Sequence, residues 1–302
     1  MTRHFLTGEE LTGEELGGLI DRAEELRADR HASDALRGQS AALIFEQPST
    51  RTRVSFEVGV SELGGHALVL REGEMQISRG ESVRDTAQVL SRFVSIIGVR
   101  TVPHAVVAEL SEHATVPVIN MLTGDHHPCQ ALADLQTLRQ RFGGLDGLKL
   151  AYVGDGNNVA NSLMLLGAKA GVEVAVATPP GLEPDPLVVQ AAGTQAEGSG
   201  SVTLSNDPAA AVDGAAAAYV DVWVSMGDQH AVQRKRLLEP YRLDEALLSR
   251  ARPDAIALHC LPAHPGEEIT EGVLYGPQSA VFDQAENRLH AQKALMELLV
   301  KG

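Results

Sequence analysis

Residues 45–53 gather hydroxyl and guanidinium side chains where a helix is expected to begin. The stretch reads Phe-Glu-Gln-Pro-Ser-Thr-Arg-Thr-Arg and follows an apolar run. A strand that leads into a helix directs free backbone N–H groups and the positive end of the helix dipole at one point. Ser49 is a good N-cap, and Thr50, Arg51 and Thr52 would add donors in the first turn. Because the dipole alone disfavours arginine there, the pattern predicts a bound anion; the alternative is a capped helix with solvated arginines.

Asp221, an acidic residue, directly follows the apolar run 217–220. The carboxyl ends of parallel strands are where α/β sheets place ligands, and a negative charge there suits an ammonium group. The alternative roles of Asp221 are a helix N-cap and a loop ion pair.

Residues 153–158, Val-Gly-Asp-Gly-Asn-Asn, form a glycine-containing turn between an expected strand and an expected helix. The turn has the first two glycines of a dinucleotide-binding fingerprint, so a nicotinamide-dependent oxidoreductase is a competing hypothesis. Val159 occupies the third glycine position, however, and the next strand ends at Thr178 and Pro179 without an acid for a ribose. A non-catalytic amino-acid-binding module is a third hypothesis.

Four stretches, in order and spacing, resemble the aspartate and ornithine carbamoyltransferase family over essentially the whole chain. They are residues 45–53, residues 75–82 (Met-Gln-Ile-Ser-Arg-Gly-Glu-Ser), residues 127–130 (His-Pro-Cys-Gln) and residues 259–262 (His-Cys-Leu-Pro). The resemblance implies that a carbamoyl group moves from carbamoyl phosphate to an amine. Phosphate is a good leaving group, so neither a cofactor nor a metal is expected.

The resemblance also implies which residues bind carbamoyl phosphate. The family's Ser-Thr-Arg-Thr loop grips the phosphate, an arginine and a histidine polarise the carbonyl, and a glutamine holds the nitrogen. The implied catalytic residues are Arg100, His127 and Cys260, and each preorganised donor to the developing oxyanion is worth about 3 to 4 kcal/mol. Without the resemblance, His127 would be interpreted as a hydrogen-bonded structural histidine. Arg288 would be interpreted as a solvated residue on a helix surface. The implied carbamoyl-phosphate residues are Ser49, Thr50, Arg51, Thr52, Gln76, Arg100, His127, Gln130, Cys260, Leu261 and Arg288.

Residues 221–227, Asp-Val-Trp-Val-Ser-Met-Gly, resemble the branch of the family that uses ornithine. The acceptor would then be L-ornithine and the product L-citrulline, as in arginine biosynthesis. An aspartate site would instead require cations at this place. Putrescine and N-acetylornithine are alternative acceptors. The implied ornithine-binding residues are Asn158, Asp221, Ser225 and Met226.

Gln76 lies in a polar loop, residues 71–82, which taken alone would be a mobile surface turn. In the family this loop reaches the neighbouring subunit's active site. The resemblance therefore implies a homo-oligomer, a trimer or a multiple of trimers, in which Gln76 completes a neighbouring site.

The two cysteines, Cys129 and Cys260, are too few for a disulfide framework and lack zinc-site spacing. His259 beside Cys260 suggests an activated thiolate. We reject that hypothesis because consecutive residues of a strand point to opposite faces. His126 and His127 lack a further ligand at helical spacing, so a metal site is not expected there.

Short apolar runs alternate with helical segments from about residue 40 onward, which predicts an α/β protein with parallel sheets. We expect two domains, each a mainly parallel sheet flanked by helices: residues 1–135 with the C-terminal helix 286–302 packed back on them, for carbamoyl phosphate, and residues 136–285, for ornithine. Residues 128–142 predict a helix, and residues 181–200 predict variable surface structure. The expected strands are 40–45, 67–70, 95–99, 116–119, 148–153, 173–177, 217–222, 255–258 and 280–282.

The chain has 302 residues, a hydrophobic fraction of 44% and a formal charge of −15. This acidity argues against nucleic-acid and membrane-surface partners. The N-terminus lacks an apolar signal core and is rich in glutamate, which predicts a cytoplasmic protein. Two positions depart from the family pattern: Gln47 stands where a basic residue is usual, and Pro265 where an arginine is common.

Overall fold

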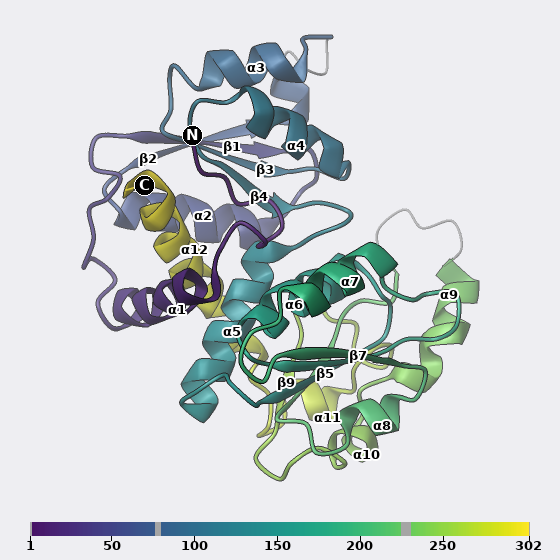
Figure 1. The fold of residues 1–302 in the computed structure, drawn as a ribbon. Helices are drawn as coiled ribbons and strands as arrows, with labels where there is room; N and C mark the ends of the chain where they lie inside the picture. Colours follow the sequence, from purple (N-terminus) through teal and green to yellow (C-terminus); the bar gives the residue numbers. More distant parts are fainter. Residues whose placement is uncertain (1, 76–79, 225–230, 302) are drawn as a thin grey trace. The chain divides into compact units, whose positions relative to one another are not determined.

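The structure is a computed structural model and describes residues 2–75, 80–224 and 231–301. Its contacts divide the chain into a first unit, Met1–Gln136 with Glu286–Gly302, and a second unit, Thr137–Ala285. The chain passes from the first unit to the second inside α5 (Pro128–Phe142) and returns inside α12 (Val281–Lys301). Each unit contains a parallel sheet flanked by helices, which confirms the expected fold class (Figure 1).

The sheet of the first unit is parallel, with strand order β2-β1-β3-β4. Figure 1 shows α3 and α4 on one face of this sheet and α2 on the other. Buried aliphatic side chains of β1 and β3 form the core between these layers. The elements are α1 (Gly13–Ala28), β1 (Ser40–Phe45), α2 (Thr50–Glu62), β2 (His66–Arg71), η1 (Glu72–Glu74), α3 (Val83–Leu90), β3 (Ile96–Arg100), α4 (His104–His113) and β4 (Val118–Leu122).

The C-terminal helix α12 packs on α1 and α2 of the first unit, as expected. Lys293 Nζ lies 2.8 Å from Glu62 Oε2. Gly59 of α2 makes room for α12, because a Cβ at this position would lie 3.2 Å from the Met296 side chain. The helix therefore completes the unit that contains the chain's beginning.

The repeated Leu-Thr-Gly-Glu-Glu sequence near the N-terminus has two structural outcomes. In the second copy, Thr12 accepts a hydrogen bond from Glu15 N, and Glu15 Oε2 accepts one from Thr12 N, so a capping box starts α1. In the first copy, the Glu10 carboxylate accepts from the backbone of Leu6, Thr7 and Gly8, and no helix begins. The same five-residue sequence therefore begins a helix only in its second copy.

The sheet of the second unit is also parallel, with strand order β7-β6-β5-β8-β9. Helices α6 and α7 cover one face and α8, α10 and α11 lie on the other (Figure 1). The elements are β5 (Lys149–Val153), α6 (Asn158–Lys169), β6 (Glu173–Ala177), α7 (Pro186–Thr194), β7 (Ser201–Ser205), α8 (Pro208–Val212), β8 (Ala217–Val220), α9 (Ala231–Leu238), η3 (Glu239–Tyr241), α10 (Glu245–Leu248), β9 (Ile256–Leu258) and α11 (Glu271–Leu274).

The structure corrects one expected strand and adds two elements that were not expected from the sequence. Residues 280–282 were expected to form a strand but lead into α12. The edge strand β7 was missed, although its sequence, Ser-Val-Thr-Leu-Ser, alternates polar and apolar residues; its side chains are only partly buried or exposed. The segment 181–200 lies mostly at the surface, as expected, but contains the helix α7, which Asp185 caps by accepting a hydrogen bond from Leu187 N. Short apolar runs do not distinguish strand from helix, which explains the first error.

Candidate functional site

The loop after β1 leads into α2 as the sequence predicts. Ser49 is the N-cap of this helix, and its hydroxyl accepts a hydrogen bond from Thr52 N at 3.3 Å. Thr50 and Arg51 form the first turn, where backbone N–H groups have no helical acceptors. The helix N-terminus and the arginine are therefore available together to a small anion.

Two arginines from distant parts of the chain converge on Thr52, a fully buried residue of that turn. Arg100 is the last residue of β3, and its Nη1 donates to Thr52 Oγ1 at 3.2 Å. Arg288 lies on α12, and its Nη2 donates to the same oxygen at 2.9 Å. Two guanidinium groups at one hydroxyl repel each other, and a bound anion would offset that repulsion.

Gln130 of α5 extends this arrangement. Its Oε1 accepts from Arg288 Nη1 at 3.3 Å, and its Nε2 donates to Asp134 Oδ1 at 2.8 Å. These partners assign the orientation of the amide. The buried Gln130 side chain thus belongs to the same cluster as Thr52 and both arginines.

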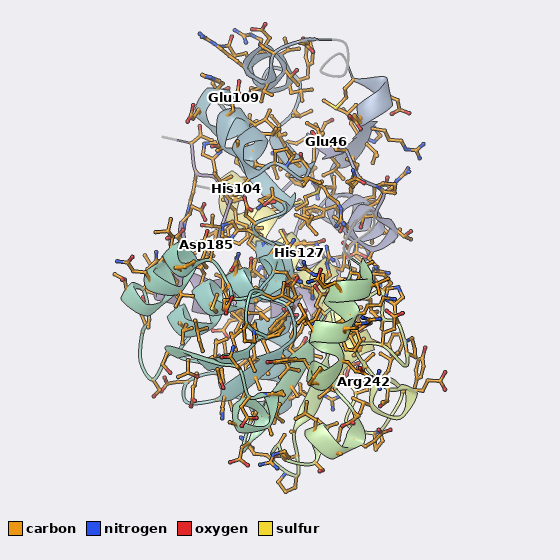
Figure 2. All side chains as sticks on the ribbon, turned by 90° about the vertical axis from the view of Figure 1, so that its right-hand side faces the viewer. Glu46, His104, Glu109, His127, Asp185 and Arg242 are labelled. Atoms are coloured by element: carbon orange, nitrogen blue, oxygen red, sulfur yellow. The ribbon has the colours of Figure 1, made fainter. Side chains whose placement is uncertain are left out.

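His127, labelled in Figure 2, directly precedes α5 and is buried. Burial lowers the pKa of His127 well below its usual value, and the charges of Arg288, Arg100 and Arg51 lower it further. The imidazole is therefore neutral at neutral pH and able to donate one N–H. Nearby Cys129 is fully buried, and burial raises the pKa of its thiol to about 12, so it is a poor nucleophile.

A cavity of ≈ 490 Å³ borders this part of the first unit. It is lined by Ser49 and Thr50, and also by Arg53 and Arg71. The buried cluster of Thr52 and Arg100 is not part of its lining. The cavity therefore adjoins the predicted phosphate loop without containing the residues expected to polarise a carbonyl.

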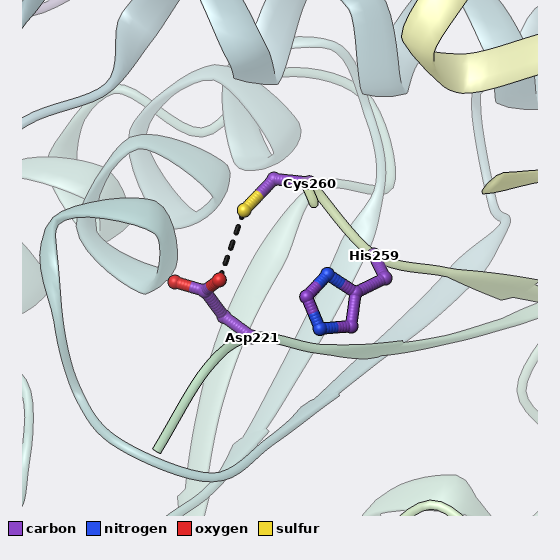
Figure 3. A group of neighbouring side chains, drawn as sticks. All are labelled: Asp221, His259 and Cys260. Carbon is purple, nitrogen blue, oxygen red and sulfur yellow. Dashed lines mark hydrogen bonds between the residues drawn. The ribbon is translucent and has the colours of Figure 1, made fainter. Parts of the chain in front are cut away.

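In the second unit, Asp221 directly follows β8 and is 6% exposed. Its Oδ1 accepts a hydrogen bond from Cys260 Sγ at 2.9 Å (Figure 3). Its Oδ2 accepts from Asn157 Nδ2 at 2.8 Å. Neither the amide nor the thiol carries a positive charge, so a cationic ligand would meet no competing cation in these two contacts.

The expectation that His259 and Cys260 point to opposite faces is wrong, because β9 ends at Leu258. Their nitrogen and sulfur atoms lie within 4.8 Å of each other and of an Asp221 oxygen. His259 is still not a base for Cys260. Its Nδ1 accepts from Leu261 N at 2.9 Å, and Nε2 lies 3.1 Å from Glu268 Oε1. Both ring nitrogens are therefore engaged, which leaves neither of them for the thiol.

The remaining predicted site residues are placed as follows. Asn158 is the first residue of α6, beside the Asn157 that holds Asp221. Leu261 has a φ of 59° and contacts His259 through its backbone. Gln76, Ser225 and Met226 lie outside the described residues.

The glycine turn before α6 does not offer a dinucleotide site. Gly156 N donates to Leu182 O at 2.8 Å. A Cβ at Gly156 would lie 2.3 Å from Pro184 N, so the chain's own backbone closely approaches this glycine. In a dinucleotide fold that approach belongs to the pyrophosphate.

The two departures from the family pattern have simple local structures. Gln47 is exposed in the loop before α2. Pro265 and Gly266 occupy the two central positions of a turn in which Glu267 N donates to His264 O at 2.9 Å. Gly266 has a φ of 92°, so the pair fits a type II turn.

Sequence reasoning missed three residues that hold the acidic site together: Asn157, Tyr152 and Glu268. Asn157 is the N-cap of α6, and its position before an apolar helix was a usable signal. Tyr152 and Glu268 are buried, and their contacts with Asn157 and His259 depend on tertiary structure. No sequence pattern indicated them.

Within the described ranges, no helix has both the length and the apolar character needed to cross a membrane.

Comparison with known proteins covers the whole chain. The model of the aspartate/ornithine carbamoyltransferase carbamoyl-P binding domain matches residues 3–140, and that of the Asp/Orn binding domain matches residues 146–299. The second match includes most of α12, which the structure groups with the first unit.

Individual proteins agree with these matches. An ornithine carbamoyltransferase from Acidothermus cellulolyticus is 53% identical over 303 residues, covering 99% of this chain and 97% of its own. The solved ornithine carbamoyltransferase from Pyrococcus furiosus is 47% identical with a TM-score of 0.96, covering 100% of this chain and 98% of its own. A solved acetylornithine transcarbamylase complexed with acetylcitrulline is 32% identical with a TM-score of 0.88, covering 98% of both chains. The chain therefore belongs to the aspartate/ornithine carbamoyltransferase family.

Proposed function

We propose that this protein transfers the carbamoyl group of carbamoyl phosphate to the side-chain amine of L-ornithine, giving L-citrulline and phosphate. The convergence of Arg100 and Arg288 on Thr52, at the N-terminus of α2, carries the proposal. A dianionic phosphate offsets two neighbouring guanidinium charges and suits a helix N-terminus. Full-length similarity to ornithine carbamoyltransferases supports ornithine as the acceptor.

The first unit binds carbamoyl phosphate in this proposal. Ser49, Thr50, Arg51 and Thr52 hold the phosphate at the start of α2. The resemblance assigns Gln130 to the carbamoyl nitrogen. Its Oε1 accepts from Arg288 Nη1 at 3.3 Å, and a carbonyl oxygen has a second lone pair for an N–H of the ligand.

The reaction needs charge stabilisation rather than a covalent intermediate. The amine nitrogen bonds to the carbonyl carbon, and the bond from that carbon to the phosphate oxygen then breaks, leaving phosphate with the electron pair. The carbonyl oxygen becomes negative in between. Arg100, Arg288 and neutral His127 are the proposed donors to it, and each such donor is worth about 3 to 4 kcal/mol. The amine attacks in its uncharged form, and the proton that it releases as the C–N bond forms passes to the departing phosphate.

The second unit binds ornithine in this proposal. Asp221 binds an ammonium group through its negative charge, and the resemblance to the ornithine branch adds Asn158, Ser225 and Met226. The resemblance also assigns Cys260 and Leu261 to the binding of the reacting groups. The neutral partners of Asp221 support this role, because no cation of the described chain is hydrogen-bonded to it.

An assay with carbamoyl phosphate and ornithine, followed by citrulline and phosphate, tests the function. Equal amounts of the two products are expected, with much slower reaction of putrescine and of N-acetylornithine. A preference for putrescine would contradict the role of Asp221 in binding an amino-acid head group. Absence of turnover together with tight dinucleotide binding would favour an oxidoreductase.

We further propose a cytoplasmic homo-oligomer, a trimer or a multiple of trimers, that serves arginine biosynthesis, with Gln76 completing a neighbouring site. Exposed apolar side chains on the first unit, among them Phe93 at 73% and Val54 at 52%, support a contact surface there. Light scattering should give a mass of three chains or a multiple of three. An active monomer would contradict the shared site.

A further inference from the structure

Asn157 donates a hydrogen bond to the Asp221 carboxylate, but the resemblance to the family gives Asn157 no role. We propose that Asn157 is a positioning residue that holds Asp221 ready for the ammonium group of the acceptor, and that Tyr152 fixes Asn157 in turn. The inference rests on the proposed function for its kinetic consequence. Its structural consequence does not depend on that function.

The Asn157 side chain is held in one orientation by three donors to its oxygen. Oδ1 accepts from Val159 N at 2.9 Å, from Ala160 N at 3.2 Å and from the Tyr152 hydroxyl at 3.1 Å. The opposite end of the amide must then present N–H groups. Nδ2 donates to Asp221 Oδ2 at 2.8 Å, so the direction of this bond is determined by the helix N-terminus and the tyrosine.

Tyr152 is itself held rigidly. It is fully buried in β5 and pairs in register with Tyr219 of β8, with ring centroids 5.7 Å apart. Burial raises the pKa of Tyr152 well above its usual value, and the negative charges of Asp221 and Asp155 add to the effect. The hydroxyl therefore stays protonated and acts as the donor to Asn157.

These contacts fix the carboxylate at both oxygens. Asn157 holds Oδ2 and Cys260 holds Oδ1. A side chain with a fixed orientation loses less conformational freedom when a ligand binds, so the fixed carboxylate binds an ammonium group more tightly. Removing the Asn157 donor should weaken acceptor binding more than it weakens carbamoyl-phosphate binding.

The competing explanation is that Asn157 only caps α6. Two substitutions separate capping from positioning, because serine and aspartate are both good N-caps and neither supplies the amide donor. Asn157→Ser removes the bond to Asp221, and Asn157→Asp also places a second carboxylate beside it. Asp185→Ala is the matched control, since it removes the cap of α7 in the same unit.

Steady-state kinetics with both substrates and thermal unfolding test the inference. In Asn157→Ser we expect the KM for ornithine to rise about ten-fold and the KM for carbamoyl phosphate to change less than two-fold. Asn157→Asp should raise the ornithine KM further, and lowering the pH should partly reverse this, because protonation restores a donor. Tyr152→Phe should give a smaller rise of about three-fold. Asp185→Ala should lower the Tm without changing either KM.

An unchanged ornithine KM in both Asn157 variants overturns the inference, as does an equal rise in both KM values that follows the loss in Tm. Crystal structures of wild type and Asn157→Ser give a readout that needs no turnover. The Asp221 carboxylate should leave its wild-type orientation in the variant, and an unmoved carboxylate overturns the inference. If wild type forms no citrulline, the proposed function fails while this structural comparison still decides the role of Asn157.

Discussion

The two candidate binding regions carry opposite local charges. In the first unit, Arg100 and Arg288 share one buried hydroxyl next to a helix N-terminus. In the second unit, Asp221 is held by an amide and a thiol, both neutral. Like charges collected at one point indicate a ligand that compensates them, whereas a carboxyl group whose partners are an amide and a thiol has no cation of its own to compete with a cationic ligand. In the first region, clustered arginines therefore favour an anion although the net charge of the chain is −15. In the second region, a single acid favours a cation.

The largest expected effect tests the cationic region, which consists of the start of α2 with Arg51 and the arginines Arg100 and Arg288. Arg51→Ala removes a guanidinium from the first turn of α2, whose charge already reaches His127. We expect kcat/KM for carbamoyl phosphate to fall about 10²- to 10³-fold, measured by phosphate release. Arg53→Ala is the matched control, because Arg53 is partly exposed and pairs with Glu57 on the helix surface. A loss below ten-fold for Arg51→Ala, or equal losses for both variants, would remove the phosphate-loop assignment.

The next largest effect tests the acidic region, which consists of Asp221 and its donors Asn157 and Cys260. Asp221→Asn keeps the size of the side chain and removes its charge, so the KM for ornithine should rise about 10- to 100-fold. The KM for carbamoyl phosphate should stay within two-fold, because the cationic cluster is unaltered. Asp254→Asn, an exposed acid of the same unit paired with Arg252, is the control and should leave both values unchanged. Parallel changes in both KM values would erase the distinction between the two regions.

The cationic region was partly predictable from local sequence. The apolar run before it, Pro48 and the N-cap Ser49 together indicate where α2 begins, and the structure confirms Ser49 as the cap. Arg288, by contrast, stands 236 positions after Thr52 in the chain. Only the resemblance to a family brought it to the site, because periodicity carries no information about contacts at that separation.

The acidic region was less predictable for a specific reason. The strand alternation used for His259 and Cys260 fails where β9 ends and Leu261 takes a positive φ. Backbone conformations of this kind are set by surrounding tertiary structure and are rare for a leucine. Similarly, Asn157 was recognisable as a helix cap, but its bond to Asp221 depends on how β5 and β8 pair in the sheet.

The smallest expected effect concerns pH and stability in the cationic region. The pKa of His127 is lower in the folded protein than its ordinary value near 6.5, so the unfolded chain binds more protons below that pH. Stability then rises with pH across this window and is lost as pH falls below about 6.5, by up to about 1.4 kcal/mol per pH unit for this group. Urea unfolding at pH 7.5 and 5.5 should show a loss about 1 kcal/mol smaller in His127→Asn than in wild type.

The pKa of His127 is lowered by burial and by neighbouring arginines, so the expected difference in pH dependence reports on the cationic region. His4 and His290 also have lowered pKa values, but they contribute equally to both proteins and cancel in the comparison. Saturating phosphate should reduce the difference between wild type and variant, because an anion beside Arg51 and Arg288 favours the protonated imidazole. An identical pH dependence for the two proteins would mean that His127 is not held neutral by its buried position among arginines. The proposed role of His127 as a neutral donor would then have to be abandoned, while the assignment of Asp221 would be unaffected.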